Sequence, residues 1–244
     1  MKKFLYIIPV FFLMSCLEDD NPNIVFDNET ILSEFLEDQD FINHEVIACA
    51  ASDNTIGGLI NVYFYPEEGA KDFRLYQSWA DDENDYSSYQ FTPITPEPFF
   101  QGALGVFKIR STCKWVVVIY EREDKIEIST PIRLKVDTQP TVWSSELSIN
   151  QDTSLMPVFS WDVRSEEDNA IFFEVLATET FELLSGTYTM ENRFQYYNLG
   201  NVVLNVTRGT PPDLIKGETY IFTVMDVSLD NWVNEVIMSP FIAE

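Results

Sequence analysis

Three cysteines and one histidine are the least common side chains of this 244-residue chain that can act as nucleophiles or metal ligands. The single histidine, His44, is too few for a histidine-based metal site or a histidine-dependent catalytic triad. Cys49 lies near the end of one predicted strand and Cys113 just before another, so the two could meet at one pole of a β-sandwich. They either form a disulfide, which an oxidising compartment favours, or remain two buried free thiols, and the sequence leaves both open.

Motifs of known catalytic chemistry are missing from the sequence. It contains no Gly-x-Ser-x-Gly, no His-Glu-x-x-His and no phosphate-binding glycine loop. Pairs of carboxylates occur throughout so acidic a chain, so they identify no glycosidase-type site. We therefore expect a protein that is not an enzyme and that has no cofactor.

Aromatic side chains beside turns are the remaining candidates for a binding site. Trp79 and Tyr86 flank the acidic segment 81–85, and Trp232 lies in a predicted hairpin loop. Flat rings beside carboxylates and amides suit a sugar, which stacks its apolar face on a ring and hydrogen-bonds through its hydroxyls. The alternative is that these rings belong to the core, as most aromatic residues on strands do.

The charge balance excludes some partners. The chain has 40 acidic and 15 basic residues and a formal net charge of −25. Such a surface repels nucleic acid and anionic lipid headgroups, so we expect neither as a partner. The acidic segment 81–85 lacks the glycine and the final glutamate of an EF-hand loop, so it and the similar segment 226–235 are expected to be solvated loops without a metal.

The elements that would position these side chains follow a short N-terminal segment. Lys2 and Lys3 precede eleven apolar residues, 4–14, a run too short to span a bilayer and typical of a secretory signal. Leu13-Met14-Ser15-Cys16 resembles the bacterial lipobox. The resemblance implies that residues 1–15 are removed and that Cys16 is lipidated, which anchors the protein in a membrane. The alternatives are an ordinary signal peptide and an uncleaved anchor.

Residues 16–45 are expected to form an acidic tether. The segment Leu17-Glu18-Asp19-Asp20-Asn21-Pro22-Asn23 resembles the export signal of Bacteroidota surface lipoproteins, which implies an outer-membrane protein facing the cell exterior. A plain solvated spacer, with the protein facing the periplasm, is the alternative. Within the tether, residues 28–41 predict a short amphipathic helix that Asn28 could cap.

Short apolar runs separated by turn residues predict an all-β chain with two tandem antiparallel immunoglobulin-like sandwiches. The first domain covers residues 46–137, with predicted strands at 46–51, 59–65, 72–79, 87–92, 104–110, 114–121 and 126–136. The second covers residues 138–244, with predicted strands at 142–149, 156–163, 171–178, 187–190, 201–208, 218–228 and 233–242. Residues 137–140 are predicted to link the two domains.

One motif points to the class of the second domain. Leu214, Gly217 and Tyr220, followed by alternating apolar residues, resemble the fibronectin type III pattern. The resemblance implies a tyrosine corner, in which the Tyr220 hydroxyl satisfies a backbone group just upstream and Gly217 permits the turn. Trp161 falls where that family has a core tryptophan. The resemblance covers about residues 140–244; the first domain lacks the corner and is expected to be a divergent sandwich of the same class.

These observations predict a non-catalytic lipoprotein of the outer membrane that acts as a binding or adhesion module. Its partners would be the membrane, through the lipid anchor, and either a glycan or an envelope protein. In the first case it would be an accessory glycan binder of an uptake system, using Trp79, Tyr86 or Trp232. In the second it would be a protein–protein adaptor or the structural scaffold of an envelope complex, and its binding would depend on salt.

Overall fold

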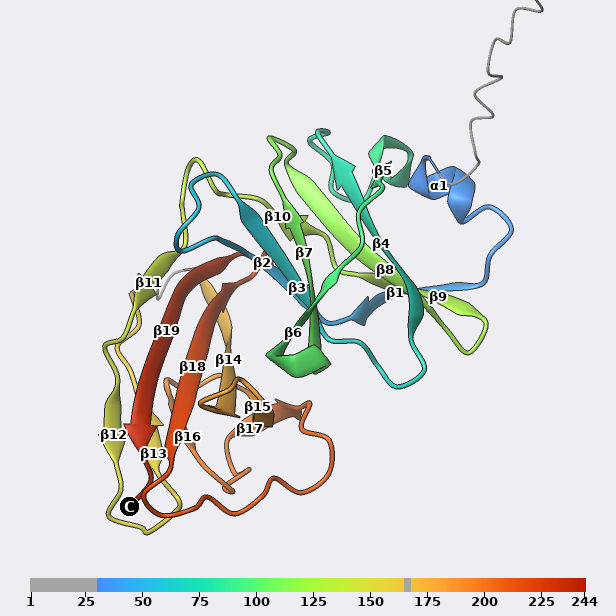
Figure 1. Cartoon of the computed structure of the whole chain (residues 1–244). Coiled ribbons are helices and arrows are strands. Elements are labelled where there is room, and N and C mark those ends of the chain that lie inside the picture. Colours follow the sequence, from blue (N-terminus) through green and yellow to red (C-terminus); the bar gives the residue numbers. More distant parts are fainter. Residues whose placement is uncertain (1–29, 165–167) are drawn as a thin grey trace, which may run out of the picture.

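The computed structural model describes residues 30–164 and 168–244 (Figure 1). The predicted signal 1–15, the predicted lipid acceptor Cys16 and the predicted helix cap Asn28 lie outside the described residues. Within them, the chain is built of strands apart from three short helical segments: α1 (Leu32–Phe35), η1 (Tyr86–Ser88) and η2 (Phe100–Gly102). Four sheets form two sandwich-like pairs, so the predicted all-β class is confirmed.

The first sandwich consists of sheets A and B. Sheet A runs in the order β1 (Phe41–Val46), β9 (Lys125–Ser129), β8 (Trp115–Arg122), β4 (Lys71–Ser78) and β5 (Gln90–Thr92), with β10 (Ile132–Arg133) paired to β8. Sheet B runs in the order β2 (Ala48–Ser52), β3 (Ile60–Phe64), β7 (Leu104–Ile109) and β6 (Glu97–Phe99).

The second sandwich consists of sheets C and D. Sheet C runs in the order β11 (Val142–Ser144), β19 (Val233–Ile242), β18 (Thr219–Ser228), β14 (Asn169–Thr178), β15 (Leu183–Thr189) and β17 (Val202–Asn205). Sheet D runs in the order β12 (Ser148–Asn150), β13 (Val158–Ser160) and β16 (Arg193–Gln195). The sheets are not purely antiparallel, because β1 pairs with β9 and β11 pairs with β19 in parallel.

The start of the first sandwich corrects the predicted tether. The predicted helix over 28–41 is reduced to the four residues of α1, and β1 already begins at Phe41. Leu32 and Leu36 are buried against the outer face of sheet A, where they join an apolar cluster that includes Tyr89 and Val117. Residues 30–45 are therefore an integral part of the first sandwich, because their apolar side chains have a sheet face to cover.

The central strands explain the long apolar runs in the sequence. On β8, Val116 and Val118 point into the core between sheets A and B, while Val117 points to the opposite face, under α1. A strand that is buried on both faces reads as a continuous apolar run instead of alternating with polar residues. On β18, Phe222 faces the core between sheets C and D, and Met225 faces the first sandwich.

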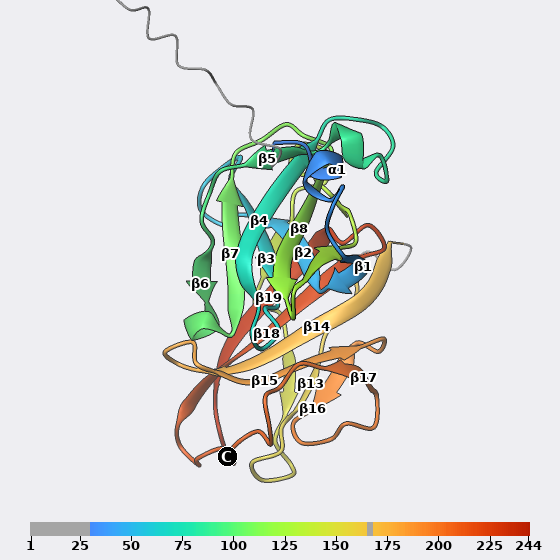
Figure 2. The same cartoon turned by 90° about the vertical axis from the view of Figure 1, so that its right-hand side faces the viewer.

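The two sandwiches share a third apolar core that lies between them. The outer face of sheet B contributes Ala51, Tyr63 and Val106, and the outer face of sheet C contributes Val175 and Val233, all buried. Figures 1 and 2 show sheet C packed beneath sheet B. The predicted linker 137–140 is fixed to the second sandwich, since the Gln139 side chain donates to Asn234 Oδ1 on β19 at 2.8 Å.

Candidate functional site

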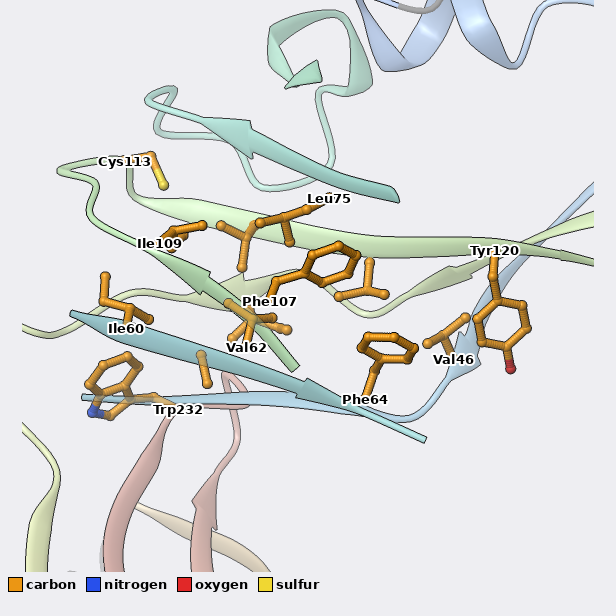
Figure 3. Packing of buried hydrophobic residues seen from close by; sticks show 14 residues of the cluster. Val46, Ile60, Val62, Phe64, Leu75, Phe107, Ile109, Cys113, Tyr120 and Trp232 are labelled. Carbon is orange, nitrogen blue, oxygen red and sulfur yellow. The ribbon is translucent and has the colours of Figure 1, made fainter. Parts of the chain in front are cut away.

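Trp232 lies at the tip of the hairpin that joins β18 to β19, and its surroundings differ from those predicted from the sequence. Trp232 was expected to be exposed, but its side chain is fully buried inside the first sandwich, beside Ile60 (Figure 3). Its indole N–H donates to the carbonyl oxygen of Gln139 at 2.8 Å. The structure therefore excludes Trp232 as a ligand-binding ring: it is the part of the second sandwich that inserts into the core of the first.

Tyr86 lies in η1 and is half-buried against the apolar cluster beneath α1. Its ring meets Tyr89 edge-to-face with the centroids 6.0 Å apart, and its hydroxyl donates to Asn43 Oδ1 at 2.9 Å. Burial raises the pKa of the hydroxyl. Tyr86 thus ties η1 to β1, and it does not share a hollow with Trp79.

Of the three aromatic candidates from the sequence, Trp79 is the one that is open to solvent. It follows β4 directly, and its indole is 48% exposed. The backbone on either side is fixed through the buried residue Ser78: the Ser78 hydroxyl accepts from the amide of Ala80, and the Ser78 carbonyl accepts from the amide of Lys114. The ring is therefore presented from a rigid strand end.

Trp79 lines a hollow of about 490 Å³ at one pole of the first sandwich. Four separate segments meet there: the β2–β3 loop, the end of β4, the β7–β8 loop and the linker that follows β10. The residues lining this hollow, called the Trp79 hollow below, are Gly58, Trp79, Arg110, Ser111, Thr112, Val136 and Asp137. Of these seven residues, the sequence identified only Trp79 as a candidate, because the other six come from segments that only the folded sandwich brings together.

Arg110 is positioned in this hollow by the loop between β2 and β3. Its Nη1 donates to the carbonyl oxygen of Gly57 at 2.8 Å. Gly58, the next residue, has a φ of +71°, a backbone conformation that favours glycine and sets the turn that presents this carbonyl. The remaining N–H groups of the guanidinium and the Asp137 carboxylate supply donors and acceptors around the ring.

The Trp79 hollow combines an exposed aromatic ring with hydrogen-bonding side chains. A half-exposed indole can stack on an apolar ligand face, and the surrounding guanidinium, carboxylate and hydroxyl groups can bind ligand hydroxyls. The chain's one histidine, His44, lies elsewhere, on β1, with its Nδ1 at 3.2 Å from Thr130 Oγ1.

Cys49 and Cys113 are free thiols in the structure. Cys49, on β2, belongs to the apolar cluster between the two sandwiches, whereas Cys113 belongs to the core within the first sandwich. The two side chains thus lie on different faces of sheet B, which explains why the sandwich does not bring them together. Burial raises the pKa of Cys49 to about 12 and that of Cys113 to about 11, so both stay protonated near neutral pH.

The two acidic segments use their carboxylates within the protein. Asp81 pairs with Lys114, whose hydrogen bond lowers the pKa of the Asp81 carboxyl, and Asp85 accepts from the amide of Ser87 at 3.1 Å. Asp226 accepts from Asn169 Nδ2 at 2.7 Å. Among residues 30–164 and 168–244, no three of the His, Cys, Asp and Glu side chains are grouped so as to hold a metal ion. The same residues include no helix long and apolar enough to cross a membrane.

Comparison with known proteins gives only remote likenesses. No family model matches the chain, and no curated protein matches it. Among solved structures, the glycoside hydrolase domain of Endo-D from Streptococcus pneumoniae R6 is 10% identical over 81% of this chain and 33% of its own, with a TM-score of 0.30. The human OSCAR ligand-binding domain is 12% identical over 83% of this chain and 99% of its own, with a TM-score of 0.25.

The receptor tyrosine kinase Torso is 10% identical over 85% of this chain and 76% of its own chain, with a TM-score of 0.25. The present chain spans about a third of the length of the Endo-D structure. At TM-scores of 0.30 and below, none of these likenesses supports a statement about function.

Proposed function

We propose that this protein is a non-catalytic, lipid-anchored binding module of the bacterial outer membrane, and that it binds a glycan at the Trp79 hollow. The observation that carries the proposal is the exposed Trp79 ring, held at a rigid strand end beside Arg110 and Asp137. Tryptophan is mostly buried in folded proteins, so an exposed indole suggests a binding role. A sugar site needs such a ring, with polar groups beside it.

The location in this proposal is supported by the N-terminal sequence. The lipobox-like Leu13-Met14-Ser15-Cys16 and the acidic segment 17–23 support a lipid anchor and display on the cell surface. The strong negative charge of the chain supports a neutral or cationic partner over nucleic acid or an anionic membrane surface.

A specific observation also favours a second candidate, a protein–protein adaptor. Strand β17 is the free edge of sheet C, and its Val203 and Leu204 side chains are 55% and 41% exposed. An open edge with exposed apolar side chains can accept a strand from a partner protein.

Glycan binding by the purified chain and its Trp79→Ala variant tests the proposal. We expect the wild-type chain to bind glycans on an array, and Trp79→Ala to weaken binding at least tenfold, about 1.4 kcal/mol, with an unchanged thermal midpoint. Ile215→Ala, which removes an exposed apolar side chain from the second sandwich, is the matched control and should bind as the wild type does.

The same ligand on intact bacteria tests the location. Cys16→Ala should remove binding from the cell surface yet leave the affinity of the purified protein unchanged, which separates the anchor from the site. Equal binding by Trp79→Ala and wild type would refute the site. Capture of an envelope protein, lost in Val203→Lys while no glycan binds, would replace the glycan binder by the adaptor.

A further inference from the structure

A second hollow lies where the two sandwiches meet, and it shares no lining residue with the Trp79 hollow. It has a volume of about 230 Å³ and is lined from both sandwiches. The first sandwich contributes Cys49 and Tyr63 among others, and the second contributes Phe173, Tyr188 and Met225. We call it the interdomain cavity.

The interdomain cavity interrupts an interface that is otherwise closely packed. Ala51, Val175 and Val233 are fully buried in the same apolar cluster, and the rings of Phe173 and Tyr188 stack with centroids 4.5 Å apart. The side chains around an unfilled apolar space lose the dispersion contacts that a packed neighbour would supply. A cavity retained in a closely packed interface is therefore a candidate ligand site.

The imidazole, the threonine hydroxyl and the side-chain amide of the cavity lie together at one end. His44 Nδ1 lies 3.2 Å from Thr130 Oγ1, and Asn231 Nδ2 donates to the carbonyl oxygen of Pro131, the next residue, at 3.2 Å. His44, Thr130 and Asn231 all line the cavity. Apart from the tyrosine hydroxyls and the Cys49 thiol, the rest of the lining is apolar or aromatic, and none of it carries a carboxylate, an ammonium or a guanidinium.

The backbone of β1 is distorted where it brings His44 to this end. Along β1, pairing with β9 passes from Asn43 opposite Ile128 directly to Val46 opposite Ser129, so residues 44 and 45 bulge out of the ladder. His44 has a φ of +63°, a left-handed conformation that costs a non-glycine residue on the order of 1 kcal/mol. Bulges and strained residues of this kind re-aim side chains, often beside binding sites.

We propose that the interdomain cavity binds a compact, uncharged, mostly apolar molecule about the size of a bicyclic aromatic, with one hydrogen-bonding group directed to His44 and Asn231. The size follows from the volume, since an apolar cavity of about 150 Å³ admits benzene. The ligand is uncharged because a buried charge here would lose its hydration without meeting an opposite charge. The single polar group follows from the placement of the polar side chains at one end.

Binding of 2-naphthol and naphthalene to the full chain tests this inference, with Cys16→Ala as the background so that no lipid takes up the probes. By calorimetry we expect 2-naphthol to bind with a micromolar Kd and the charged 2-naphthoate at least tenfold more weakly. Cys49→Leu, which extends a side chain into the cavity, should weaken 2-naphthol at least tenfold without lowering the thermal midpoint.

Two further variants distinguish binding in the interdomain cavity from binding elsewhere on the chain. His44→Gly keeps the left-handed backbone and removes the imidazole, so it should weaken 2-naphthol several-fold and leave naphthalene unchanged. Trp79→Ala should leave both probes unchanged, which makes this result independent of the glycan proposal. Absence of binding at millimolar 2-naphthol, or binding that Cys49→Leu does not reduce while its fold is intact, would overturn the inference.

Discussion

Glu174 is a carboxyl group placed inside the second sandwich, between Phe172 and Leu176 on the inward face of β14. Its Oε1 lies 2.6 Å from Thr189 Oγ1, which in turn lies 2.6 Å from the carbonyl oxygen of Glu191. A threonine hydroxyl has one proton and the carbonyl can only accept it, so both contacts are satisfied together when Glu174 itself is protonated. Burial raises the pKa of Glu174 to about 8, while its hydrogen bonds with Thr189 and Thr187 oppose the rise.

This raised pKa predicts a stability that falls with pH. Between the unfolded value of 4.5 and about 8, the folded protein keeps a proton that the unfolded chain releases. The unfolded state then binds fewer protons, so the free energy of unfolding decreases by up to about 1.4 kcal/mol per pH unit over this window and levels off above it. Glu174→Gln, which cannot ionise, should be free of this contribution.

Urea unfolding of wild type and Glu174→Gln at pH 5, 6, 7 and 8 measures the difference. We expect the variant to gain stability relative to the wild type at each step. Glu182→Gln, at an exposed glutamate on the loop before β15, is the control and should follow the wild type throughout. A constant difference between wild type and Glu174→Gln across these pH values would show that Glu174 is ionised in the fold.

At the scale of elements, the corner before β18 confirms the geometry that its motif predicted. The Tyr220 hydroxyl accepts a hydrogen bond from the amide of Ile215 at 2.9 Å, and Leu214 is buried in the core of the second sandwich. Gly217 has a φ of +88°, a conformation that favours glycine. The corner fixes where β18 starts, and β18 is one of the two central strands of sheet C.

Tyr220→Phe tests the contribution of the corner. The change removes the acceptor and leaves the amide of Ile215 partly buried without its partner, so we expect a loss of about 1–2 kcal/mol in the free energy of unfolding. Tyr197→Phe removes a hydroxyl that donates to Asp213 at an exposed site, and should cost less than about 0.5 kcal/mol. Denaturant titrations of both variants measure these free energies of unfolding. If the two variants lose the same free energy, the hydrogen bond of the corner does not stabilise the fold more than an exposed one.

Elements with their own pattern could be predicted from the sequence, and those that depend on neighbours could not. The long strands β18 and β19 carry enough alternation to be placed within a residue of their ends. The three-residue strands β6 and β16 were missed, since each exists by pairing with an adjacent strand. The helix over 28–41 was predicted too long. Its apolar spacing includes side chains that dock α1 on sheet A, but the residues that follow lead into β1.

The same distinction between local pattern and tertiary neighbours holds for the residues of the candidate site. Trp79 could be identified because a tryptophan beside an acidic turn is informative by itself. Arg110 and Asp137 could not, because nothing local in their sequence shows that the loops carrying them converge on the same pole. Trp232 misled because Asp230 and Asn231 mark its hairpin as an exposed turn, whereas its surroundings come from the other sandwich.

At the scale of the whole molecule, the hairpin tip of the second sandwich closes the core of the first. The amide of Ala50 on β2 donates to the carbonyl oxygen of Asn231, and the amide of Arg133 on β10 donates to that of Asp230, so the tip is bonded to both sheets of the first sandwich. Together with the apolar cluster between sheets B and C, this insertion makes each sandwich part of the other's packing.

The shared packing predicts that the two sandwiches unfold as one unit. Calorimetry of the wild type should show a single transition whose calorimetric and van't Hoff enthalpies agree. Trp232→Ala empties a buried ring site in the first core and loosens its link to the second, so it should cost about 3–5 kcal/mol and separate the transition into two. Trp161→Ala, which empties a site within the second sandwich alone, should lower the midpoint by a comparable amount but keep one transition. Two transitions in the wild type would show that the sandwiches are stable independently; a single transition that only Trp232→Ala divides would identify the inserted hairpin as the coupling between them.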